Sequence, residues 1–103
     1  MKQIVLGVVF ALAISSAGAN GGFVPPAGFV PDARAAEAIA RAVLIPIYGE
    51  GIVRGEEPLH ATRHGDEWYV NGTLQCAPHC VGGTAFVSIS AKDGRILSVF
   101  HGK

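Results

Sequence analysis

The two cysteines, Cys76 and Cys80, are the side chains whose spacing comes closest to a chemical motif. They enclose Ala77-Pro78-His79. Redox-active cysteine pairs normally have two residues between the sulfurs and lie at a helix N-terminus, so this spacing and its proline argue against redox catalysis. A zinc site would need further ligands from the remaining histidines, which are His60, His64 and His101. We expect a structural disulfide, and free thiols or a metal site that includes His79 stay open as alternatives.

The acidic residues are poor candidates for acid–base catalysis, which needs a carboxylate in an apolar pocket that tunes its pKa. We expect them at a helix cap, on a helix surface, in a loop and at turns; they are Asp32, Glu37, Glu50, Glu56, Glu57, Asp66, Glu67 and Asp93. His60, within an expected strand, is the best candidate base, although a surface or packed histidine is the commoner case. The sequence lacks the glycine, serine and histidine motifs of common hydrolases and phosphate-binding loops. We therefore expect no enzymatic activity, no cofactor and no resident metal.

The composition is that of one small folded domain. The chain has 103 residues, of which 50% are hydrophobic and 16% charged, which is too apolar for a disordered protein. Eight basic residues balance eight acidic residues, so nothing in the net charge favours nucleic acid or an anionic membrane as a partner.

The N-terminus has the pattern of a secretory signal peptide. Lys2 is followed by an apolar run over residues 4–14 and by the small residues Ala17-Gly18-Ala19. The run is shorter than the roughly 20 residues that a membrane-spanning helix needs, and no stop-transfer pattern follows. We expect residues 1–19 to be removed, leaving a periplasmic or extracellular protein without a membrane span.

The rest of the chain divides into an arm and a domain. Residues 20–30 form a Gly/Pro-rich arm with a near-repeat, and residues 31–103 form a single domain. A helix begins after the N-cap Asp32, and its core face consists of Ala36, Ile39, Ala40, Val43 and Leu44. Glu37 and Arg41 lie on its solvated side, and Pro46 is expected to end or kink the helix at Ile45.

The C-terminal half alternates with a period of two residues. It predicts strands over residues 58–63, 68–74, 85–91 and 95–100, the last two joined by an Asp93-Gly94 turn that pairs Lys92 with Arg95. That pairing places five residues on the core face, namely Val87, Ile89, Ala91, Ile96 and Phe100. It places six residues on the second face, namely Phe86, Leu97 and Val99 together with Ser88, Ser90 and His101. The second face is too apolar for solvent alone, so we expect it to be covered by the chain or to bind a partner.

The expected architecture is α+β, with one N-terminal helix packed on an antiparallel sheet of about four strands. Several segments follow one another in an order that covers nearly all of the chain after residue 19. They are Gly28–Asp32, Ala36–Leu44, Ile45–Glu50, Gly65–Leu74, Gly82-Gly83, Asp93–Ile96 and His101–Lys103. The most specific are residues 46–50, Pro-Ile-Tyr-Gly-Glu, and the closing His-Gly-Lys.

In these segments the chain resembles the bacterial immunity proteins of the nuclear transport factor 2 fold. The resemblance implies a cystatin-like α+β fold and neutralisation of a polymorphic toxin by protein binding rather than chemistry. The sequence departs from the family pattern between Leu74 and Gly82, where the cysteine segment replaces a shorter one without cysteines. Cysteines at this position fit an exported protein.

The leading hypothesis is therefore an exported immunity protein that occludes a cognate toxin, as a monomer or a homodimer. The residues we expect to contact the toxin are Tyr48, Tyr69, His79, Phe86, Leu97, Val99 and His101. A periplasmic module that binds a small ligand or metal, and an envelope inhibitor of a lytic enzyme, are the alternatives.

Overall fold

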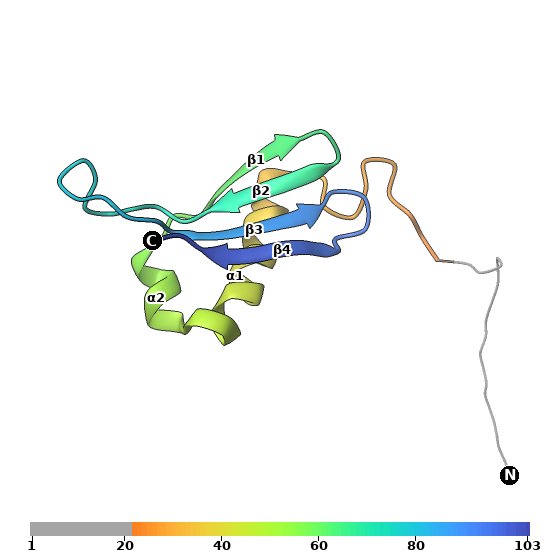
Figure 1. Ribbon diagram of the computed structural model, residues 1–103. Coiled ribbons are helices and arrows are strands. Elements are labelled where there is room, and N and C mark those ends of the chain that lie inside the picture. The colour runs from red at the N-terminus through yellow and green to blue at the C-terminus, as the bar shows by residue number, and fades with distance from the viewer. Residues whose placement is uncertain (1–21) are drawn as a thin grey trace, which may run out of the picture.

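The computed structural model describes residues 22–103, so the expected signal peptide and the first two residues of the arm lie outside the described part. The helices are α1 (Ala33–Tyr48) and α2 (Glu50–Gly55). The strands are β1 (His60–His64), β2 (Glu67–Asn71), β3 (Ala85–Ser90) and β4 (Ile96–His101). The strands form one antiparallel sheet in the order β1-β2-β3-β4 (Figure 1). The predicted α+β class is confirmed, and the short helix α2 is an element that the sequence did not predict.

Helix α1 begins where the sequence predicts. The Asp32 side chain caps it by accepting a hydrogen bond from the Ala35 N–H at 2.9 Å. Ala36, Ala40 and Leu44 are buried on its core face. The small alanines let the helix approach the sheet closely, so α1 contacts β1, β2 and β3.

Of the two outcomes expected at Ile45, an end or a kink, the end is wrong, because the helix continues through Pro46 to Tyr48. Proline removes one backbone donor, and so close to the helix end only one intrahelical bond is lost. The last turn is closed by the Gly49 N–H, which donates to the Ile45 carbonyl at 2.8 Å. Ile45 and Tyr48 also pack against the core, which stabilises the turn after the proline.

The side chains of Glu37 and Arg41 connect the helix to the rest of the chain. The Glu37 carboxylate accepts a hydrogen bond from the backbone N–H of Ala61 in β1 at 3.1 Å. Arg41 forms an ion pair with Glu57. The solvated side expected for these residues is therefore partly a contact with the segment that leads into β1.

The core lies between α1 and one face of the sheet. Figure 1 shows α1 behind the sheet, with the face toward the viewer free of helices. The largest fully buried side chains are Leu44, Ile89, Val30, Val70 and Val87. Trp68 is buried beside them, and its indole N–H donates to the Val30 carbonyl at 2.8 Å.

The end of the Gly/Pro-rich arm is part of this core. The backbone N–H groups of Phe29 and Val30 donate to the carbonyls of Lys92 and Ala91, both at 3.0 Å. Gly28 has a φ of +87°, and a Cβ there would lie 2.4 Å from the Ala91 carbonyl oxygen, so this close approach requires glycine. The arm thus adds its second repeat to the domain through residues 28–30.

The register predicted for the β3–β4 hairpin was wrong. The structure pairs Phe86 with Phe100 and Val87 with Val99, and the ladder is irregular between Ser88 and Ile89. The Ser90 N–H donates to the Arg95 carbonyl at 2.8 Å, so the loop spans residues 91–94 rather than Asp93-Gly94 alone. Lys92 therefore does not pair with Arg95.

The loop is longer because the backbone of Ala91 has other partners. The Ala91 N–H donates to the Asp66 carbonyl at 2.8 Å, and the Ala91 carbonyl accepts from Val30. Neither group is then available to β4. Beyond the irregularity between Ser88 and Ile89 the register moves by one further residue, so Phe100 lies on the outer face of the sheet, whereas Val99 and His101 lie on the α1 side, the reverse of the expected placement.

Candidate functional site

The outer face of the sheet carries a row of aromatic rings that crosses all four strands. The His64 and Tyr69 rings stack with centroids 4.2 Å apart, and Tyr69 meets Phe86 edge-on at 5.4 Å. Phe86 then stacks on Phe100 at 4.7 Å. We call these four residues, His64, Tyr69, Phe86 and Phe100, the aromatic row. Offset and edge-to-face contacts at these distances are favourable and hold the rings in fixed positions.

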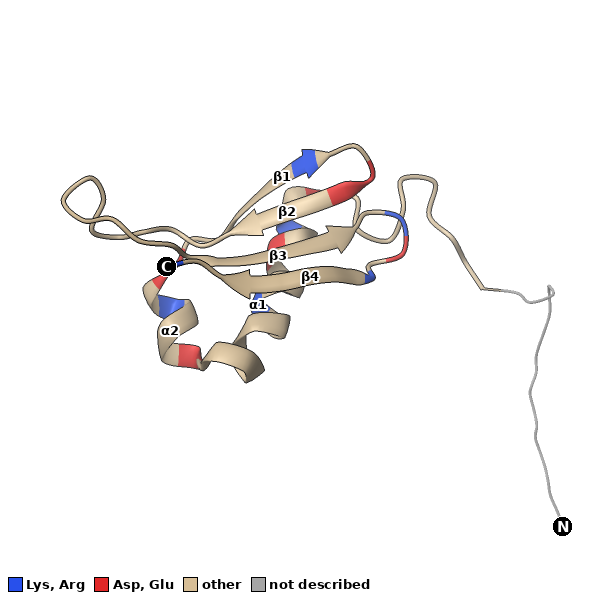
Figure 2. Cartoon of the chain, in the orientation of Figure 1, with Lys and Arg blue, Asp and Glu red and all other residues tan. Residues whose placement is uncertain are grey.

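Small polar side chains surround the aromatic row. The hydroxyls of Ser88 and Ser98 are 2.7 Å apart on adjacent strands. By strand register the same face also carries Thr62 and Asn71. Glu67 is the one acidic residue that the register of the described strands places on this face, and Figure 2 shows the charges of the sheet gathered at its turn ends. Aromatic side chains with few charges are typical of the centre of a protein–protein interface.

The aromatic row is exposed enough to be contacted. Phe100 is 54% exposed, and Tyr69 and Phe86 are half-buried. Among residues 22–103 both helices pack elsewhere, so no helix covers the row (Figure 1). An aromatic surface held by a rigid sheet can bind a partner without a large loss of conformational entropy.

The structure divides the seven expected contact residues among five places. Tyr69 and Phe86 lie in the aromatic row, whereas Val99 packs toward the core. Leu97 lies beside the ladder irregularity and is 38% exposed. His79 is exposed on the cysteine loop. Tyr48 and His101 lie against each other on the α1 side, with ring centroids 5.3 Å apart.

Sequence reasoning missed Phe100 and His64 as members of the row. The Phe100 position was assigned from a two-residue turn, and one irregularity in the ladder reverses which face a side chain occupies. The first strand was expected to end at residue 63, whereas His64 still belongs to β1 and pairs with Glu67. The signal that was available is the alternation of Tyr69 with Trp68 and Val70, which fixes the outer face of β2.

Glu56 and His101 form a second polar cluster beside Tyr48. One oxygen of the Glu56 carboxylate lies 2.6 Å from His101 Nε2, and the other accepts from the Ala85 N–H at 2.7 Å. His101 Nδ1 is 2.8 Å from the Gly102 carbonyl. The hydrogen bond to Glu56 first, and the one to Gly102 second, raise the pKa of His101. Both carboxylate oxygens are engaged, so the cluster joins the end of α2 to β3 and β4.

The cysteine loop extends past the end of the sheet (Figure 1). Cys76 and Cys80 form a disulfide, and the His79 N–H donates to the Cys76 carbonyl at 2.7 Å inside the loop. The disulfide takes up both thiols that a zinc site would use. In residues 22–103 no three histidine, cysteine, aspartate or glutamate side chains gather closely enough to hold a metal ion.

Neither α1 nor α2 combines the length and apolar character that crossing a membrane requires, as far as residues 22–103 are concerned.

Comparisons with known proteins identify the family. A family model described as "NTF2 fold immunity protein" matches residues 35–103. A protein of Escherichia coli (strain K12), "Uncharacterized protein YhhH", is 36% identical over 56 residues, which are 54% of this chain and 43% of that protein. The chain therefore matches less than half of the length of this relative. No solved structure matches the sequence significantly.

The family match begins inside α1 and runs through the whole sheet to the last residue, so it covers the elements that build both faces described above. The fold is the α+β arrangement that the family description implies. The chain belongs to the NTF2-fold immunity proteins.

Proposed function

We propose that this protein is an exported immunity protein that neutralises a cognate bacterial toxin by binding it, without catalysis. The observation that carries the proposal is the family match over residues 35–103. Toxin neutralisation by a small protein requires a stable surface that covers an active site or locks a conformation. The helix-free face of the sheet supplies such a surface.

The aromatic row is the part of that face that we assign to toxin contact. Its rings offer apolar area, and the serine, threonine and asparagine side chains around them can hydrogen-bond at the rim. Binding energy in such interfaces is concentrated in a few central aromatic residues. Phe100 and Tyr69 are the anchors that we propose, because they combine partial exposure with ring contacts that hold them in place.

Export is the second part of the proposal. It is supported by the signal-peptide pattern in residues 1–19 and by a disulfide, which persists in an oxidising compartment. The toxin would then act in the periplasm or pass through it. The test is to express the full-length gene and sequence the N-terminus of the protein in the periplasmic fraction. A start at Asn20 is expected, and an unprocessed protein confined to the cytoplasm would contradict export.

The assignment of the aromatic row is tested with two phenylalanine variants. Phe100 in the row and Phe29 outside it are 54% and 51% exposed, so Phe100→Ala and Phe29→Ala remove the same group at similar exposure. With the toxin recovered by co-purification, we expect Phe100→Ala to weaken affinity about tenfold or more and Phe29→Ala by about twofold or less. The measurement is isothermal titration calorimetry on variants whose circular dichroism matches the parent protein.

Equal affinities of the two variants for the toxin would exclude the aromatic row as the contact surface. Recovery of no toxin, even from cells shown to make one, would contradict the proposed function itself.

A further inference from the structure

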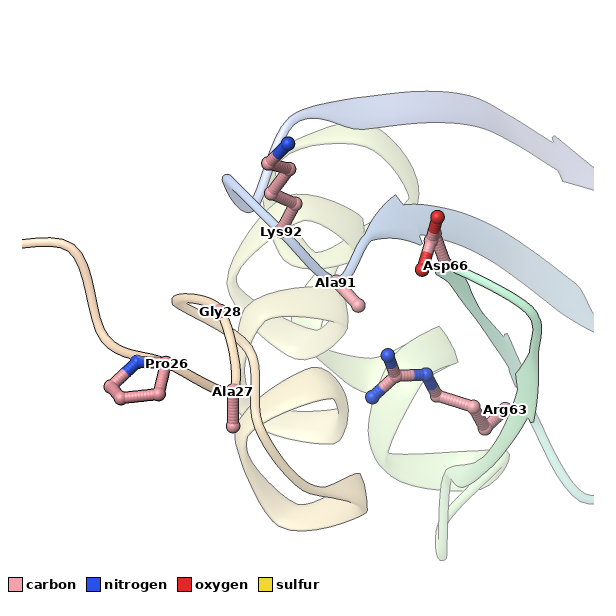
Figure 3. Close-up of a pocket in the computed structure, with 7 residues that line it drawn as sticks. All are labelled: Pro26, Ala27, Gly28, Arg63, Asp66, Ala91 and Lys92. Carbon is pink, nitrogen blue, oxygen red and sulfur yellow. The ribbon is translucent and has the colours of Figure 1, made fainter.

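A cavity of about 300 Å³ lies between the arm, the β1–β2 hairpin and the β3–β4 loop (Figure 3). These turns are at the end of the sheet opposite the cysteine loop (Figure 1). Three segments far apart in the sequence line it. The arm contributes residues 26–28, the β1–β2 hairpin contributes Arg63 and Asp66, and the β3–β4 loop contributes Ala91 and Lys92. Its volume lies at the lower end of the range for small-molecule sites.

Backbone hydrogen bonds fix the shape of the cavity. The Gly28 N–H donates to the Pro25 carbonyl at 3.0 Å, which turns the arm, and residues 29 and 30 are bonded to the β3–β4 loop. The Ala91 N–H also donates to the Asp66 carbonyl at 2.8 Å, which ties the loop to the hairpin. The three walls are therefore held to one another before any ligand enters.

Arg63 is held in place with its terminal nitrogens free. Its Nε donates to the Gly65 carbonyl at 2.8 Å, and its guanidinium carbon lies 5.4 Å from the centre of the Trp68 ring. Figure 3 shows the guanidinium pointing into the cavity. Its two terminal nitrogens have no acceptor within hydrogen-bond distance among residues 22–103. Such a fixed fork suits the two oxygens of a carboxylate.

Asp66 brings the opposite charge to the same cavity. Asp66 lines the same space as Arg63, and no ion pair joins the two side chains. The Lys92 ammonium is turned away from Arg63 in Figure 3, so Arg63 and Asp66 are the two charged residues that we assign to the space. A ligand that satisfies both must carry a carboxylate and, close to it, an N–H donor.

We propose that this cavity binds an α-amino carboxylate unit, either a free amino acid or the C-terminal residue of a peptide chain. The ligand carboxylate pairs with the Arg63 fork, and the nitrogen on the neighbouring carbon donates to Asp66. This site is separate from the aromatic row, and the proposal does not rest on toxin binding. It would be a second recognition site of the protein, beside the aromatic row.

The test is a titration followed by nuclear magnetic resonance, with ¹⁵N-labelled protein made from the full-length gene. The probes are glycine, N-acetylglycine and N-acetylglycine methyl ester, which lacks the carboxylate. We expect saturable shifts of the Gly28, Ala91 and Arg63 Nε–H signals with one or both of the carboxylates and none with the ester. Binding of N-acetylglycine alone identifies a chain end as the ligand, and binding of glycine alone identifies a free amino acid.

Two variants make the result specific. Arg63→Lys keeps the charge but loses the fork, and Asp66→Asn removes the anion; each should weaken binding about tenfold. Arg34→Gln, an exposed arginine on α1 outside the cavity, should leave binding unchanged. The proposal is overturned if the ester shifts the same signals, if Arg63→Lys binds as tightly as the parent protein, or if no carboxylate gives saturable shifts. Because no toxin is used, failure here leaves the proposed function untouched.

Discussion

Single side chains fix the start of α1 and join the end of α2 to the sheet. Asp32 caps α1, and the Glu56 carboxylate bonds both His101 and the backbone of Ala85. The Asp32 cap was predictable because it depends on residues three positions apart. The Glu56 contact was not, because it joins residues 45 positions apart and only the fold brings them together.

The His101 cluster predicts a pH dependence of stability. Since the pKa of folded His101 is raised, its stabilising contribution is fully present below the unfolded value of about 6.5 and is lost as pH rises through the folded pKa. We expect the free energy of unfolding to fall from pH 6 upward, and His101→Asn to remove that part of the slope. The measurement is urea denaturation at several pH values.

His60→Asn is the matched control for this prediction, because His60 is an exposed histidine outside the cluster. It should keep the parent slope. If His101→Asn keeps the parent slope as well, the protonated histidine does not stabilise the fold.

At the level of elements, the structure depends on how the arm and the β3–β4 loop share backbone bonds. The period of two residues predicted a strand at β2, and Trp68 and Val70, two positions apart, are both buried on its core face. The β3–β4 register failed because Ala91 bonds to the arm and to the Asp66 carbonyl instead of β4. Helix α2 was missed because it contains Gly51 and Gly55, which lower helix propensity, and tertiary contacts with α1 outweigh that preference.

Two glycine substitutions should have opposite effects on stability, and the first of them tests the contact between the arm and the β3–β4 loop. Gly28→Ala forces a Cβ against the Ala91 carbonyl at a positive φ, so it should cost on the order of 2 kcal/mol of stability. Gly51→Ala lies in α2 with nothing within 4 Å of the added Cβ, so it should stabilise by about 0.5–1 kcal/mol. Urea unfolding curves of both variants give the comparison. An unchanged midpoint for Gly28→Ala would mean that the arm does not pack on the loop in solution.

At the scale of the whole molecule, the two faces of the sheet differ in what covers them. One face of the sheet packs on α1 and builds the core, and the other displays the aromatic row. The sequence allowed the fold class and an apolar second face with Phe86 on it to be predicted. It did not allow Phe100 to be placed, because one irregularity between Ser88 and Ile89 reverses the faces of β4. The cavity around Arg63 was also beyond prediction, because three distant segments form it.

Neutralisation by binding is tested by the protection of susceptible cells. Cells that direct the co-purified toxin to the periplasm would be grown with the full-length gene, with Phe100→Ala or with no immunity gene. We expect cells with the full-length gene to survive, and fewer cells to survive with Phe100→Ala at an equal protein level in the periplasm. Cell death despite abundant full-length protein in that compartment would contradict neutralisation by binding.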